Sequence, residues 1–187
     1  MLKITPTETS GAQMEQFGYI AGRKGIARIM LPITRFLRAV NAERYIEPRE
    51  RLLDIGCGDG YFLRRSTCNE RYGLDKRTGD DVVDTLHFPG CYFDYVTMLA
   101  VIEHIADPTA LVKEIHRVLK PGGRFIFTTP KQRAEFLIRF YVKNIDEEHE
   151  VYYDRDSVRQ LAGNFFDLFG HHTYMFGLNQ VFCLIKK

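Results

Sequence analysis

Cysteine is scarce in this 187-residue chain, and its spacing excludes a zinc site built from cysteines. The four cysteines are Cys57, Cys68, Cys91 and Cys183. No two of them form a C-x-x-C pair, and the gaps between them match no zinc-binding motif, so no metal site is expected. The first 25 residues also lack the apolar segment of a secretory signal. These absences predict a cytoplasmic protein with reduced thiols.

Long apolar runs and an excess of one charge are absent as well. The most apolar stretch, Tyr95–Ile102, is eight residues long, whereas a membrane-spanning helix needs about 20. The formal net charge is only +2, so no nucleic-acid partner is expected. Apolar residues make up 45% of the chain and charged residues 27%. These fractions exclude a disordered or fibrous chain, and the length fits one domain.

The N-terminal part of the chain divides into two segments. Residues 1–20 are mostly polar and predict a leader before a single domain of residues 21–187. Residues 21–48 predict a helical cover. Apolar residues recur there at helical spacing: Ile26, Ile29, Met30, Ile33, Leu37 and Val40. Residues 21 to 51 contain eight Lys or Arg and three Glu. The helix therefore either packs on the core with a basic outer face or makes weak contact with an anionic membrane surface.

From residue 51 onward, short apolar runs alternate with helical patterns. Strands are predicted at 51–55, 71–74, 82–83, 92–99, 124–128, 168–176 and 180–186, and helices at 61–67, 107–119, 131–142 and 154–165. Only six residues separate Asp75 from Val82, which is too few for the usual crossover helix. Either the helix between the second and third strands is missing and a bare loop makes the crossover, or the third strand lies elsewhere. The pattern predicts an α/β, Rossmann-like fold. Its mostly parallel, seven-stranded sheet has a closing antiparallel strand and helices on both faces.

A glycine-rich loop follows the first predicted strand of this sheet. Its sequence is Asp54-Ile55-Gly56-Cys57-Gly58-Asp59-Gly60. Glycines at a strand end let the backbone turn sharply and approach a ligand, although a purely structural turn has the same composition. The spacing is G-x-G-x-G rather than the G-x-G-x-x-G of dinucleotide enzymes, which disfavours a nicotinamide-dependent oxidoreductase.

Asp75 ends the second predicted strand, 19 residues after Gly56. A carboxylate at this place accepts hydrogen bonds from both hydroxyls of a ribose and disfavours a 2′-phosphate. The alternative is an aspartate that caps a turn. The glycine loop at the right distance favours the ribose.

Several motifs together resemble the class I S-adenosylmethionine-dependent methyltransferases, in the small-molecule type 11 branch. The resemblance covers about residues 50 to 130. The motifs that carry it are Asp54–Gly60, Asp75, Phe93–Val96, Val101–Ile105 and His116–Gly123.

The resemblance implies S-adenosylmethionine as the cofactor and S-adenosylhomocysteine as the product. It assigns cofactor contacts to ten residues: Asp54, Gly56, Cys57 and Gly58 at the methionine part, Asp75 at the ribose, Lys76 and Asp84 at the adenine, and Met98, Leu99 and Ala100 along the cofactor. Lys76 stands where the family usually has an apolar residue, so its aliphatic stem would cover the adenine ring.

The acceptor side of the site is less specified. A hydroxyl acceptor benefits from a general base, and the candidate catalytic residues are His149 and His104. Each has an alternative interpretation: His149 as a histidine in an acidic loop, and His104 as a structural histidine. Residues 131–153 carry aromatic side chains and predict a helical lid over a small-molecule acceptor, such as a sugar or a lipid-linked precursor. A catalytically idle module that binds S-adenosylmethionine is the alternative function.

Overall fold

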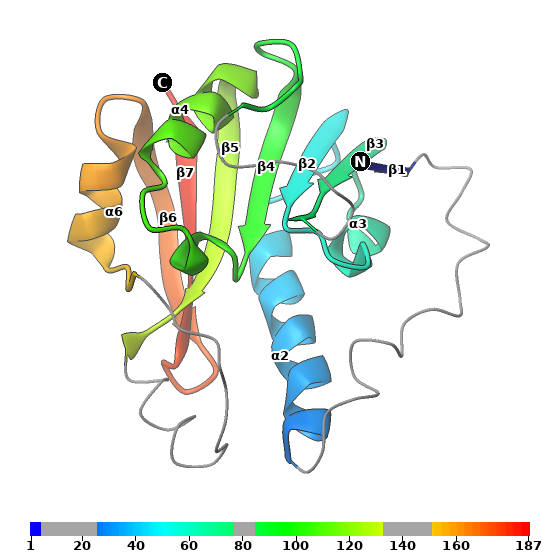
Figure 1. Cartoon of the computed structure of the whole chain (residues 1–187), viewed down its shortest axis with the longest axis vertical. Coiled ribbons are helices and arrows are strands. Elements are labelled where there is room, and N and C mark those ends of the chain that lie inside the picture. The colour runs from blue at the N-terminus through cyan, green and yellow to red at the C-terminus, as the bar shows by residue number, and fades with distance from the viewer. Residues whose placement is uncertain (5–25, 77–84, 133–150) are drawn as a thin grey trace.

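A seven-stranded sheet forms the centre of the computed structural model, which describes residues 1–4, 26–76, 85–132 and 151–187 (Figure 1). The strand order is β1-β3-β2-β4-β5-β7-β6. The strands are β1 Leu2–Ile4, β2 Arg51–Ile55, β3 Glu70–Leu74, β4 Phe93–Leu99, β5 Leu119–Pro130, β6 Phe166–Tyr174 and β7 Asn179–Lys186. The helices are α2 Ile26–Glu43, α3 Tyr61–Arg65, the 3₁₀ turn η3 Ile102–His104, α4 Thr109–Val118 and α6 Arg155–Ala162.

The strand directions confirm the predicted α/β fold. β2 pairs in parallel with β3 and β4, and β4 pairs in parallel with β5. β7 inserts between β5 and β6 and is antiparallel to both, so it is the closing antiparallel strand. The parallel strands at the centre of the sheet end at one edge, where ligands bind in folds of this type.

The N-terminus differs from the sequence prediction. Leu2–Ile4 form β1, which pairs antiparallel with residues 71–73 of β3. These three residues therefore belong to the sheet and not to a leader. The strand predicted at 82–83, and the connection before it, lie outside the described residues. Among the described residues the sheet has seven strands, and β1, which was not predicted, is one of them and lies beside β3.

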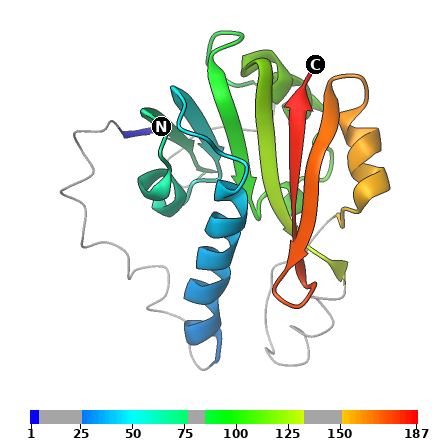
Figure 2. The same ribbon diagram turned by 180° about the vertical axis from the view of Figure 1, so that it is seen from behind.

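The two faces of the sheet carry different helices. Alternation along β5 sends Ile126 to the face covered by α2 and α3, where Ala39, Ala42 and Phe62 pack with it. Phe125 and Phe127 point to the opposite face and join the larger core under α4 and α6. Figures 1 and 2 show α2 projecting beyond the edge at which β2 and β4 end. This helix therefore stands beside the ligand-binding edge of the sheet.

Part of the predicted cover falls outside the structure. Residues 133–142 of the helix predicted at 131–142, and residues 133–150 of the lid predicted at 131–153, lie outside the described residues. Within the described ranges, no helix is both long and apolar enough to cross a membrane.

Candidate functional site

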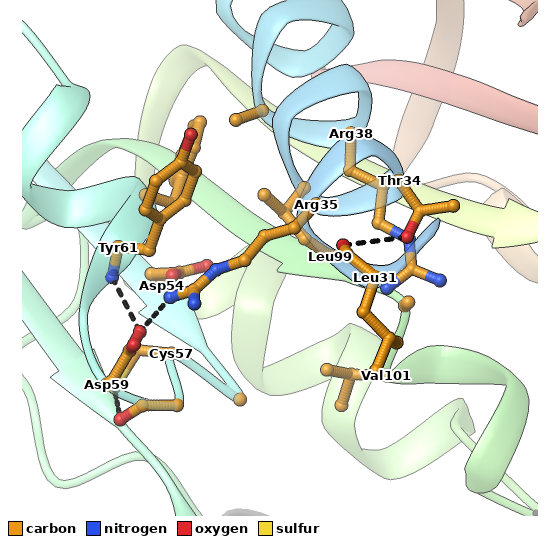
Figure 3. Close-up of a pocket in the computed structure, with 15 residues that line it drawn as sticks. Leu31, Thr34, Arg35, Arg38, Asp54, Cys57, Asp59, Tyr61, Leu99 and Val101 are labelled. Atoms are coloured by element: carbon orange, nitrogen blue, oxygen red, sulfur yellow. Dashed lines mark hydrogen bonds and ion pairs between the residues drawn. The ribbon is translucent and has the colours of Figure 1, made fainter. Parts of the chain in front are cut away.

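A cavity of about 420 Å³ lies where the glycine loop, the end of β4 and the inner side of α2 meet (Figure 3). Its lining comes from three segments of the chain: Leu31, Thr34, Arg35, Arg38 and Ala39 from α2; Asp54, Gly56, Cys57, Gly58, Asp59, Tyr61 and Phe62 from the loop and its flanks; and Leu99, Ala100 and Val101 after β4. The cavity therefore occupies the ligand-binding edge that the sequence predicts.

The glycines of the loop are required by its backbone. Gly56, Gly58 and Gly60 have φ angles of 76°, 59° and 76°, in the left-handed region that favours glycine. A Cβ on Gly56 would lie 2.3 Å from Cγ2 of Val101. The loop can therefore pass close to the end of β4 only because Gly56 has no side chain. Cys57 is buried beside it and lines the cavity.

Asp54 places a buried carboxyl group on the cavity wall. Its Oδ1 accepts a hydrogen bond of 2.7 Å from the Thr97 hydroxyl. Burial raises the pKa of Asp54 to about 7, helped by the nearby charge of Asp75 and opposed by the Thr97 hydrogen bond. A bound cation at this wall would stabilise the carboxylate form.

Asp75 lies beside the loop but does not line the cavity. Its Oδ2 accepts a hydrogen bond of 2.8 Å from the backbone nitrogen of Gly58. This contact ties the end of β3 to the glycine loop. Lys76 is exposed and lies outside the cavity lining, and Asp84 lies outside the described residues.

The three residues predicted after β4 divide between the core and the cavity. Met98 is fully buried in the larger core, whereas Leu99 and Ala100 line the cavity. Ala100 has a φ angle of 59°, which is unusual for a residue with a side chain, and its nitrogen donates to the Thr128 carbonyl at 3.0 Å. The strained residue therefore lies at the site, where β4 leaves the sheet.

The α2 wall is the part of the site that sequence reasoning missed. The guanidinium group of Arg35 pairs with the carboxylate of Asp59 and lies over the Tyr61 ring, 4.2 Å from its centre (Figure 3). Arg38, one turn further along the helix, also lines the cavity. The signal in the sequence was the pair of arginines three residues apart, which lie on one side of a helix.

The orientation of α2 corrects the expectation of a basic outer face. Arg35 and Arg38 face the cavity, while Met30, Ile33 and Phe36 are 37%, 45% and 47% exposed. At 100° per residue, these three apolar residues lie on the side of the helix away from the cavity.

The predicted bases are not brought to this cavity by the described residues. His104 is exposed at the end of η3 and is not part of the lining, and His149 lies outside the described residues. Within the described ranges, no group of three or more His, Cys, Asp or Glu side chains is placed to hold a metal ion.

Comparison with known proteins places this geometry in a family. A family model described as a methyltransferase domain matches residues 23–165. The ubiquinone biosynthesis O-methyltransferase of Pseudomonas syringae is 30% identical over 43% of this chain and 44% of that protein. The enzyme of the same name from Sodalis glossinidius is 32% identical over 42% and 40%. The chain thus spans less than half the length of the curated relatives it matches.

Solved structures share the fold at lower identity. A chain of the Haloferax volcanii complex that contains the methyltransferase activator Trm112 has a TM-score of 0.69 and 17% identity, covering 86% of this chain and 93% of that one. Phosphoethanolamine N-methyltransferase 2 of Haemonchus contortus, in complex with S-adenosyl-L-methionine, has a TM-score of 0.60 and 16% identity, covering 81% and 52%. The family match over residues 23–165 confirms the motif-based prediction: the chain belongs to the S-adenosylmethionine-dependent methyltransferases.

Proposed function

We propose that this chain transfers the methyl group of S-adenosylmethionine to an oxygen atom of a small-molecule acceptor. The observation that carries the proposal is the cavity between the glycine loop and α2, with cationic and acidic groups on opposite walls. When bound, the sulfonium group of the cofactor supplies an electrophilic methyl group. In such a displacement the protein mainly holds donor and acceptor in line and excludes water.

The residues around the cavity fit the two ends of the methionine part of this cofactor. Arg35 and Arg38 offer guanidinium groups to the carboxylate, and the buried Asp54 offers a carboxylate to the ammonium group. Gly56 and Gly58 let the backbone approach the same part of the ligand.

The ribose and adenine contacts extend past the cavity along the carboxyl edge of β3. Asp75 is the proposed ribose ligand, oriented by its hydrogen bond to Gly58. The adenine contacts of Lys76 and Asp84 are part of the proposal. So are the contacts that the cavity-lining residues Leu99, Ala100 and Cys57 would make with the cofactor. Met98 would act from the core, by supporting Leu99.

An oxygen acceptor is supported by the curated relatives, which are named as O-methyltransferases of ubiquinone biosynthesis. The acceptor is proposed to be a small hydroxylated molecule, either a sugar or the precursor of a lipid. A general base would accelerate such a transfer by about 10²–10⁴-fold, and His149 remains the first candidate, with His104 second.

Contact with a membrane surface is proposed for the outer side of α2. Met30, Ile33 and Phe36 are exposed together on one side of a helix that projects from the sheet (Figure 1). Such an apolar side can enter the headgroup region of a bilayer.

The test is a transfer assay with methyl-labelled S-adenosylmethionine and panels of phenols, sugars and lipid precursors. Label in an acceptor, together with formation of S-adenosylhomocysteine, is the expected result. Cofactor binding without transfer to any panel would instead favour the idle module. In the same assay, His149→Ala should lower turnover strongly while cofactor affinity stays within about twofold. Equal turnover of the variant and the parent chain would exclude a catalytic role for His149.

A further inference from the structure

His172 of β6 forms hydrogen bonds with the C-terminal part of α2, on the face of the sheet that this helix covers. Its Nε2 atom lies 2.7 Å from Oδ1 of Asn41, and its Nδ1 atom lies 3.0 Å from the Tyr45 hydroxyl. Asn41 is a buried residue of the last turn of α2, and Tyr45 follows just after the helix. One side chain therefore links the end of α2 to the strand at one edge of the sheet.

The hydrogen-bond pattern assigns one tautomer to His172. The amide nitrogen of Asn41 donates to the Leu37 carbonyl at 2.7 Å, so Oδ1 of Asn41 faces His172 and accepts from Nε2–H. The Nδ1 atom is then free to accept from the Tyr45 hydroxyl. Burial lowers the pKa of His172, and the nearby charge of Arg44 acts in the same direction. The ring is therefore neutral at neutral pH, and both hydrogen bonds form.

Other contacts fix the same end of the helix. A Cβ atom on Gly170 would lie 2.5 Å from Cε1 of Tyr45, so the Tyr45 ring packs directly on the backbone of β6. Arg124 of β5 donates to the Tyr45 carbonyl at 2.8 Å. Ala39 and Ala42 of α2 are buried in the core cluster on this face. The last two turns of α2 are thus held against the sheet, and the hydrogen bond from His172 fixes which side of the helix faces it.

Arg38 depends on this anchor more than Arg35 does. Arg35 is held by its own ion pair with Asp59. The guanidinium group of Arg38 has neither an ion pair nor a hydrogen bond in the part of the chain that the structure describes, although it lines the cavity. Arg38 precedes Asn41 by three residues, so the two lie on the same side of α2, about 4.5 Å apart along its axis. The direction of Arg38 therefore follows from how His172 holds Asn41.

We propose that His172 is a positioning residue for the cofactor, holding α2 so that Arg38 meets the carboxylate of S-adenosylmethionine. This inference rests on the methyltransferase function proposed above. It assigns a role in cofactor binding to a residue that does not line the cavity and acts through Asn41 and Arg38. A group already held in its binding position loses little conformational freedom when the ligand binds, so the contact is stronger.

The experiment compares two ligands that share the nucleoside part of the cofactor. S-adenosylhomocysteine carries the amino-acid carboxylate, whereas 5′-methylthioadenosine lacks it. A contact that only stabilises the fold would affect both ligands alike, but a contact that positions Arg38 affects only the ligand with the carboxylate. Calorimetric titration measures the affinity of the full chain for each ligand, and circular dichroism checks that each variant is folded.

The variants separate the hydrogen bonds of His172 from its shape. His172→Phe keeps a ring but loses both hydrogen bonds, and His172→Gln restores an amide that can donate to Asn41 and accept from Tyr45. Asn41→Leu removes the same contact from the helix side and carries the test if His172→Phe does not fold. His171→Phe is the matched control, because this neighbouring histidine of β6 lies 3.1 Å from Gln180 and stacks on a ring of the opposite core.

His172→Phe should weaken the binding of S-adenosylhomocysteine roughly 3- to 10-fold and leave that of 5′-methylthioadenosine within about twofold. His172→Gln and His171→Phe should keep both affinities within about twofold of the parent chain. In an Arg38→Met background, His172→Phe should have little further effect, because the side chain that it positions is already gone.

Three results would overturn the inference alone: unchanged affinity for S-adenosylhomocysteine in His172→Phe, equal weakening of both ligands, or a full effect of His172→Phe in the Arg38→Met background. Failure of the folded parent chain to bind S-adenosylhomocysteine would overturn the proposed function and this inference with it.

Discussion

The guanidinium group of Arg35 pairs with the carboxylate of Asp59, and this contact joins α2 to the glycine loop across the cavity. The same guanidinium lies over the Tyr61 ring, at the start of α3. Because arginine keeps its charge at all physiological pH values, the cavity has a permanent cationic wall opposite the buried Asp54. Arg35 thus holds α2 to the glycine loop, and it is also a residue proposed to bind the carboxylate of the cofactor.

Removal of the Arg35 charge should weaken cofactor binding. Arg35→Met keeps much of the stem but loses the guanidinium group, so the affinity for S-adenosylmethionine should fall about tenfold or more, as expected for a lost charge-assisted hydrogen bond. Calorimetric titration measures the change. Arg49→Met is the control, because Arg49 belongs to the same basic segment but does not line the cavity. A similar loss in both variants would show a general effect of charge rather than a contact.

A side chain at Gly56 should clash with Val101, which lies just after β4. Gly56→Ala places a Cβ atom 2.3 Å from Val101 Cγ2 on a backbone with a φ angle of 76°. Gly122→Ala has a similar φ angle of 71° but no atom within 4 Å, so it isolates the cost of backbone strain, about 1–2 kcal/mol.

Gly56→Ala should therefore lower the free energy of unfolding more than Gly122→Ala does, and it should abolish cofactor binding. Adding Val101→Ala should restore part of the stability. Thermal and denaturant unfolding measure these differences. Equal destabilisation by the two single substitutions would contradict the close contact between the loop and Val101.

Cofactor affinity should depend on pH through Asp54. Its pKa of about 7 means that the neutral acid dominates in the free protein below that pH. The ammonium group of the cofactor stabilises the carboxylate, so binding releases a proton, and affinity should fall toward tenfold per pH unit below pH 7. Titrations between about pH 5.5 and pH 7 measure the slope.

Asp54→Asn should bind the cofactor weakly and with little pH dependence over that range. The pH dependence of folding stability that Asp54 causes has the opposite sign to that of cofactor affinity. Because the pKa of Asp54 in the folded state lies above the ordinary value of an aspartate, the contribution of Asp54 to stability is lost as the pH rises from about 4 to 7. A flat binding profile in the parent chain would exclude contact between Asp54 and a cation.

The outer side of α2 should govern attachment to lipid vesicles. Ile33→Ser and Phe36→Ser should reduce co-sedimentation with vesicles of anionic phosphatidylglycerol several-fold, because each removes exposed apolar area from α2. Phe169→Ser is the control, since Phe169 is 52% exposed but lies on β6. No binding by the parent chain, or equal binding by all variants, would contradict membrane contact through α2.

The central sheet and the glycine loop could be predicted from sequence because each depends on local patterns. Apolar runs that end in glycine mark β2, and the left-handed φ angles of Gly56 and Gly58 need glycine for steric reasons. The position of β1 could not be predicted, because a three-residue strand pairs through backbone atoms with a partner about 70 residues away. Such a pairing produces no side-chain pattern from which it could be predicted.

The inward direction of the α2 arginines was missed for a related reason. Basic residues at helical spacing usually face water, and only the tertiary position of the helix shows that Arg35 and Arg38 meet the loop. The family resemblance assigns Met98 to the cofactor together with Leu99 and Ala100, because residues at the end of the fourth predicted strand line the cofactor in that family. Strand alternation turns its side chain into the opposite core instead.

The most direct test of this account is calorimetric titration of the folded chain with S-adenosylmethionine and S-adenosylhomocysteine, with NAD as the control ligand. Binding of the first two ligands in the micromolar range, weakened by Arg35→Met and by Asp75→Ala, is the predicted result. Failure of the folded chain to bind either of them, or comparable binding of NAD, would contradict the assignment of the cavity to the cofactor.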